Sequence, residues 1–160
     1  MENIQVLTKT NHIKKAQEKE DIMLNKERQE EVVELCQHLI QKQSYSGHED
    51  GVAGVLEEQL KKKGFDSVTV DKYGNVIGCI KGNRPGKKIL FDGHIDTVPV
   101  TDETEWQYPP FAAEIHDGKI YGRGTSDMKG AVAGFVTAAA AFAEDTKKDF
   151  AGEIYVAGVV

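Results

Sequence analysis

The sequence predicts an α/β fold in which helices pack on a sheet, and two observations support this. Segments with the apolar spacing of amphipathic helices alternate along the 160 residues with short runs whose apolar residues alternate or are continuous, as in strands. Glycine-containing turns join some of these runs into hairpins. Interleaved helices and strands favour a layered α/β sheet over an all-helical or an all-strand fold.

Two helices are expected near the start of the chain. Apolar residues recur every three or four positions from about Lys26 to Lys42, and again between Val52 and Leu60. Gly64 is placed where it would end the second helix. Residues 1–24 are polar and weakly periodic, so we expect a frayed helix or a loose arm there. The domain itself is then expected to cover residues 25–160.

Two hairpins and a strand between them follow. Residues 67–82 read as a hairpin around Gly74-Asn75, and residues 113–121 as a second one around Asp117-Gly118. The run KKILFDGHID, reached through the loop NRPG, has the character of a buried strand.

A helix and a strand close the sequence. An alanine-rich helix opens after GRGTSDMKG and ends near Asp145, and residues 152–160 form a nearly continuous apolar strand. That strand breaks off at Val160 without a turn or a polar tail, so we expect the chain to be part of a longer protein. We also expect the strand to lie at an exposed sheet edge, where unpaired backbone favours association.

Composition limits the class of protein. With 39% hydrophobic residues the chain can bury one core and form about one domain. A net charge of −6 argues against nucleic acid or an anionic membrane as the main partner. No apolar run approaches the roughly 18 residues of a membrane span, and no secretory segment is present. The two distant cysteines, Cys36 and Cys79, suit reduced thiols in a cytoplasmic protein.

The first candidate site lies in FDGHIDTVPV, residues 91–100. Asp92, His94 and Asp96 alternate, and residues two apart on a strand share a face. A neutral imidazole binds zinc through one nitrogen while a carboxylate accepts the other N–H and fixes the tautomer. His94 with Asp96 therefore has the composition of a metal ligand and its orienting partner. The alternative is that these residues are solvated in a loop past the strand.

The second candidate site is GRGTSDMKG, residues 122–130. Asp127 lies where a helix begins, so it is either a functional carboxylate or, like Ser126, a helix cap. The spacing fits neither phosphate-binding glycine motif. A serine-hydrolase site built from Ser126, His94 and Asp96 is disfavoured, because no G-x-S-x-G surrounds the serine.

Taken together, the two clusters carry a resemblance. GHIDTVPV followed by GRGTSDMKG is similar to the zinc-dependent metallopeptidase family of acetylornithine deacetylase, succinyl-diaminopimelate desuccinylase, aminoacylase and related dipeptidases and carboxypeptidases. The likeness runs from about Arg28 to Val160. It includes SYSGHED, KYGNVIG and the segment with Trp106, Pro110 and Phe111. The residues of these two motifs are most similar to the deacetylase and desuccinylase branch of the family, including its selenium-metabolism-linked hydrolases.

The resemblance implies roles for three residues. His94 matches a ligand of one zinc, Asp96 the acid that orients this histidine in catalysis, and Asp127 a carboxylate that bridges two zincs. It implies a three-layer α/β/α sandwich with a mixed sheet, of which this chain is the N-terminal part. The general-base glutamate, the later ligands and the lid domain would follow Val160. The chain alone is therefore expected to hold metal weakly and to be inactive.

For the parent protein the resemblance implies a cytoplasmic, homodimeric di-zinc hydrolase. Its substrate would be an N-acyl amino acid or a short peptide, cleaved at an amide bond by metal-activated water. Cobalt or manganese could replace zinc, since they accept similar ligands. The competing hypothesis is a non-catalytic, truncated α/β module or interaction protein.

Other polar residues near the motifs receive structural interpretations. We expect His48 to lie at the surface near the substrate and Asp92 to support the loop. Arg123 and Lys129 are expected to be solvated or paired locally. Trp106 is expected to pack its loop over the sheet edge.

Overall fold

The computed structural model describes residues 25–160 and forms an α/β domain, as predicted. The proposed arm, residues 1–24, lies outside the described residues. The long helices are α2 (Lys26–Ile40), α3 (Asp50–Lys62) and α4 (Gly130–Asp145). The main strands are β1 (Ser67–Val70), β2 (Val76–Lys81), β3 (Arg84–His94) and β6 (Ala151–Val159). A small hairpin, β4 (Glu114–His116) and β5 (Lys119–Tyr121), and two short turns, η1 (Glu103–Glu105) and η2 (Thr125–Lys129), complete the order.

The sheet is mixed, as predicted. Its four strands follow the order β1-β2-β6-β3. β1 pairs antiparallel with β2, and β2 antiparallel with β6. β6 pairs parallel with β3, with His94 opposite Val159 at the far end. Parallel neighbours need a long crossover connection, which α4 supplies here.

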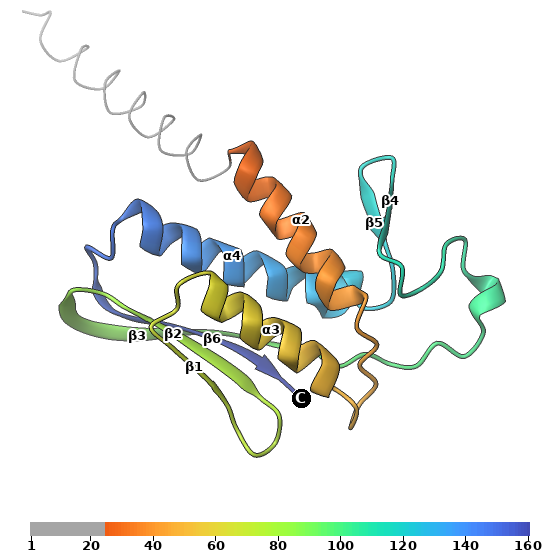
Figure 1. Cartoon of the computed structure of the whole chain (residues 1–160), viewed down its shortest axis with the longest axis horizontal. Coiled ribbons are helices and arrows are strands. Elements are labelled where there is room, and N and C mark those ends of the chain that lie inside the picture. The colour runs from red at the N-terminus through yellow and green to blue at the C-terminus, as the bar shows by residue number, and fades with distance from the viewer. Residues whose placement is uncertain (1–24) are drawn as a thin grey trace, which may run out of the picture.

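The helices cover one face of this sheet (Figure 1). α3 contacts β1 and β2, α4 contacts β3 and β6, and α2 packs across α3 and α4. The opposite face carries polar side chains, among them Lys88 and Glu153, whose ion pair measures 3.0 Å. The described residues therefore supply the sheet and one helical layer of the expected sandwich.

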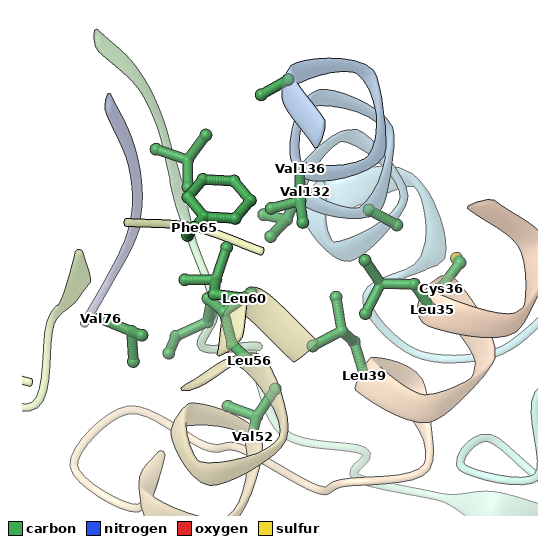
Figure 2. Close-up of a cluster of buried hydrophobic side chains, with 14 of the residues drawn as sticks. Leu35, Cys36, Leu39, Val52, Leu56, Leu60, Phe65, Val76, Val132 and Val136 are labelled. Atoms are coloured by element: carbon green, nitrogen blue, oxygen red, sulfur yellow. The ribbon is translucent and has the colours of Figure 1, made fainter. Parts of the chain in front are cut away.

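The core lies between the sheet and the three helices. Figure 2 shows the side chains of Leu39, Leu56 and Val136, one from each helix, directed towards a common interior. Glycines in the strands let the helices come close. A Cβ on Gly158 would lie 2.3 Å from the Cδ2 of Leu56. This packing explains the periodic apolar residues of the helices, which the sequence identified correctly.

Two expectations about strand position were wrong. β3 is an edge strand of this sheet rather than a buried one, and Ile89, Leu90 and Phe91 are 50%, 56% and 42% exposed. β6 is not at an edge, because it pairs with both β2 and β3. β3 also begins earlier than expected, since the NRPG segment extends into it from Arg84. Pairing order depends on contacts between distant segments, which apolar content alone does not reveal.

Both predicted hairpins are present. The β1–β2 turn is closed by Asp71, whose carboxylate accepts from the backbone N–H of Tyr73 and Asn75 at 2.8 and 3.1 Å. Asp117 and Gly118 take φ values of 50° and 72° between β4 and β5, as a two-residue hairpin requires. Cys36 and Cys79 are buried free thiols, as expected. Among the described residues, no helix is long and apolar enough to cross a membrane.

The close contact at Gly158 generates a paired prediction. Gly158→Ala should lower the free energy of unfolding by about 1–3 kcal/mol, because the added methyl overlaps Leu56. Gly54→Ala, in α3 with open space at its Cβ position, should raise it by up to about 1 kcal/mol through helix propensity. Urea unfolding of both variants measures the difference. Equal effects would show that the sheet and α3 are not in contact at Gly158.

Candidate metal centre

His94 and Asp96 lie where the chain leaves the sheet. β3 ends at His94, so Asp96 belongs to the extended segment after it rather than to the strand. The Nδ1 of His94 lies 3.0 Å from the Oδ1 of Asp96 and 3.1 Å from its backbone oxygen. The two residues are thus paired, although not by the shared strand face that the alternation suggested.

Asp127 reaches the same histidine from another segment. It lies in η2, which follows Gly124 in the left-handed conformation (φ 85°) and precedes α4. The peptide bond between Asp127 and Met128 is cis. The Oδ1 of Asp127 is 2.8 Å from the Nε2 of His94. Gly93 permits this approach, because a Cβ there would lie 2.8 Å from the Cε of Met128.

The helix-cap interpretation of Asp127 and Ser126 was wrong. Neither side chain caps η2 or α4, since no side-chain hydrogen bond is made to the first backbone N–H groups of either element. The Asp127 side chain is 87% exposed and directed to His94 instead. This leaves its carboxylate accessible to a cation.

The two carboxylates change the ionisation of the histidine. The hydrogen bond that the protonated Nε2 donates to the Asp127 carboxylate raises the pKa of His94 above its usual value. Burial opposes the rise, and Asp96 adds to it. Both ring nitrogens face oxygen acceptors, and an N–H group on each nitrogen can donate to them, which stabilises the doubly protonated ring. A cation at Nε2 would take the place of that proton.

These residues border a cavity of about 290 Å³, whose lining includes His94, Asp96 and Asp127 together with Thr97 and Arg123. A larger hollow of about 670 Å³ lies among the three long helices, but charged and apolar side chains line it and no histidine or cysteine does. Metal and acid–base chemistry therefore favours the smaller cavity as the functional site.

Comparisons with known proteins identify relatives of this chain. Residues 90–160 match the model of Peptidase family M20/M25/M40. The succinyl-diaminopimelate desuccinylase of Beijerinckia indica is 39% identical over 132 residues, which is 78% of this chain and 34% of that enzyme. Residues 90–160 of this chain are a segment of the M20/M25/M40 peptidase family. It spans about a third of the length of the curated relatives that it matches.

Solved structures show the same fold. The M20 metallo-carboxypeptidase Sso-CP2 of Sulfolobus solfataricus superposes with a TM-score of 0.70 at 27% identity, covering 81% of this chain and 30% of that one. The YXEP protein of Bacillus subtilis, described as a dinuclear metal binding peptidase from the M20 family, has a TM-score of 0.61 at 18% identity, covering 84% and 35%. The predicted α/β class is confirmed as that of an M20 catalytic domain.

The donor atoms of this M20 chain fit part of a zinc centre. Imidazole nitrogen and carboxylate oxygen are suitable zinc ligands, and a carboxylate on the other ring nitrogen is their usual support. Zinc sites take three or four protein ligands. Within residues 25–160 no three histidine, cysteine, aspartate or glutamate side chains converge on one metal position. The described residues thus offer two donors, His94 and Asp127.

Lys129 is not solvated, contrary to expectation. It is fully buried, and its Nζ donates to the backbone oxygens of Leu39 and Lys42, both at 2.8 Å. Burial lowers the pKa of Lys129 to about 8. Its partners are backbone carbonyls in the last turn of α2 and just beyond it, some ninety residues away, so no local sequence signal could have revealed this role.

The remaining polar residues lie around the site without joining the histidine. The Cζ of Arg123, in the segment after β5, lies 5.0 Å from the ring centroid of Trp106, so this tryptophan packs against that cation. Asp92 and His48 are exposed, and neither lines the cavity. Ser46, to which the sequence assigned no role, donates from Oγ to the Oδ2 of Asp96 at 2.5 Å.

The buried ammonium gives a stability prediction. Lys129→Met should lower the free energy of unfolding by about 2–3 kcal/mol, because the backbone carbonyls of Leu39 and Lys42 each lose a charged donor, the first of them in a buried hydrogen bond. Lys62→Met, an exposed position near the end of α3, is the matched control and should change stability by less than about 0.5 kcal/mol. Urea unfolding compares them. If Lys129→Met proves as stable as the control, the ammonium does not hold α2.

Proposed function

We propose that the protein containing this chain is a metal-dependent hydrolase that cleaves the amide bond of an N-acyl amino acid or a short peptide. The observation that carries the proposal is the convergence of His94 and Asp127. Their donor atoms come from separate segments, lie 2.8 Å apart, and face the cavity with Asp96 behind the imidazole. Residues 25–160 would form the N-terminal part of the catalytic domain.

The proposed roles follow from the geometry. His94 through Nε2 and Asp127 through its carboxylate would hold the metal, and the exposed Asp127 could serve a second cation as well. Asp96 holds the proton on Nδ1, which leaves the lone pair of Nε2 for the metal. When bound, such a metal polarises a carbonyl and makes water a better nucleophile. Zinc suits these ligands, as do cobalt and manganese.

The substrate class follows from the curated relatives. Relatives at 37–39% identity are named succinyl-diaminopimelate desuccinylases. We therefore favour an N-acyl amino acid with a small dicarboxylic or related acyl group over a longer peptide. We also propose that the parent protein is a cytoplasmic homodimer.

Substitution of the two donors tests this proposal. In the full-length protein, His94→Ala and Asp127→Asn should each weaken zinc binding by more than about 100-fold, since direct ligands matter more than their supports. Hydrolysis of N-succinyl and N-acetyl amino acids should fall with it. Asp117→Asn, at the tip of the β4–β5 hairpin, is the matched control and should leave both unchanged.

Metal content by elemental analysis and a hydrolysis panel provide the two readouts. A purified wild-type protein that carries no stoichiometric metal and hydrolyses none of the N-acyl amino acids or dipeptides would overturn the proposal. That result would favour the competing hypothesis of a non-catalytic α/β module.

A further inference from the structure

The hydrogen bonds of Asp96 extend beyond His94. Its Oδ1 faces the Nδ1 of His94 at 3.0 Å, while its Oδ2 accepts from the Oγ of Ser46 at 2.5 Å. Both carboxylate oxygens therefore have a partner, and the two partners lie on different segments. A carboxylate held on both sides cannot turn about its terminal torsion without breaking one of these bonds.

The loop that carries Ser46 is fixed to the segment after β3. The buried Ser44 donates from Oγ to the backbone oxygen of Ile95 at 2.8 Å, and its own backbone oxygen accepts from the N–H of Thr97 at 2.7 Å. The hydroxyl of Tyr45 accepts from the N–H of Val100 at 3.2 Å. These bonds flank Asp96 on both sides, so the loop and the extended segment behave as one unit.

A tight turn then directs the serine hydroxyl. Gly47 has a φ of +86°, a conformation that side chains other than glycine rarely adopt. The carboxylate of Glu49 accepts from the N–H of Gly47 at 2.6 Å and closes the turn. The pattern Ser-Gly-x-Glu in SYSGHED thus has a physical reading: glycine and glutamate shape the turn, and the serine points its donor at Asp96.

We propose that Ser46 is a positioning residue of the metal centre, acting on His94 through Asp96. The proposal rests on the proposed function, in which His94 is a metal ligand. Ser46 keeps the Asp96 carboxylate in line with Nδ1, and this keeps Nε2 aimed at the cavity. Because the Asp96 carboxylate is partly exposed, water competes with the Nδ1–H group for its oxygens. Loss of the serine hydroxyl therefore lets Asp96 rotate away from Nδ1 for part of the time.

Two opposing effects set the size of the expected change. The serine proton draws charge from Asp96 and so weakens its bond to Nδ1 slightly, which acts against metal affinity. The backbone oxygen of Asp96, 3.1 Å from Nδ1, also remains as an acceptor when the side chain turns. We expect the lost alignment of Asp96 to reduce zinc affinity by more than the stronger Asp96–Nδ1 bond increases it. Because the backbone acceptor remains, the loss of affinity should be about tenfold, the lower end of what supporting residues produce.

Zinc affinity of the full-length protein tests the proposal, measured by competition with a chromophoric chelator. Ser46→Ala should weaken zinc binding about tenfold. Ser46→Thr retains the hydroxyl at an exposed position and should restore affinity to within about twofold of wild type. Ser126→Ala is the matched control, because this exposed serine lines the same cavity beside Asp127 without capping the helix. It should bind zinc as the wild type does.

A second measurement needs no metal. In the zinc-free protein, exchange of the His94 Nδ1 proton with solvent, followed by NMR of the labelled imidazole, should be at least several times faster in Ser46→Ala than in wild type or Ser126→Ala. If the wild type binds no zinc at all, the proposed function fails, and the proton exchange still decides the role of Ser46.

Three results would overturn the inference. One is a zinc affinity of Ser46→Ala equal to that of Ser126→Ala. Another is unchanged exchange of the Nδ1 proton. The third is a loss of affinity that Ser46→Thr does not restore and that accompanies a lower unfolding midpoint, since this would make Ser46 a structural residue of its loop.

Discussion

The close approach between the end of β3 and the turn before α4 is the constraint on which the site depends. His94 lies on one segment and Asp127 on the other, 33 positions apart in sequence and 2.8 Å apart in space. Gly93 leaves room for the side chain of Met128 beside this approach, since a Cβ there would lie 2.8 Å from the Met128 Cε. The parallel pairing of β3 with β6 through α4 brings the start of that helix to the carboxyl end of β3. Ligand sites in open α/β sheets form at this end of the strands.

The end of α2 and the loop after it stabilise both halves of this approach. Lys129 ties the turn that carries Asp127 to the last carbonyls of α2. Ser46, a few residues further along the chain, holds the carboxylate that faces His94. One short stretch of chain therefore holds a neighbour of each donor through separate hydrogen bonds: Lys129, two residues after Asp127, and Asp96, the partner of His94. This arrangement gives a physical reason why a segment without metal ligands should matter to a metal centre.

Sequence reasoning succeeded where the signal was local. Helix periodicity, the glycine turns of both hairpins and the two polar motifs each lie within a few neighbouring residues. It failed where the outcome depends on distant partners. The apolar run of β3 resembles a buried strand, yet strand order leaves Leu90 more than half exposed. A lysine in a polar motif looks solvated, yet Lys129 is buried against carbonyls that only the fold brings near. The resemblance to M20 enzymes singled out His94, Asp96 and Asp127. Ser46 was identified only from its hydrogen bond to Asp96 in the structure.

The electrostatics of the site explain why a metal and a proton compete there. Two carboxylates beside one imidazole raise the pKa of His94, so in the absence of a cation the ring keeps its second proton to a higher pH than an ordinary histidine does. The same negative charge that favours a proton on Nε2 would also attract a divalent cation. Metal binding at this position, as proposed, would therefore release a proton, and it would weaken as the pH falls through the raised pKa of His94. Asp96 keeps the other proton in place during this exchange, because the metal position is on the opposite side of the ring. A site built this way depends less on the number of its charges than on which nitrogen each carboxylate faces.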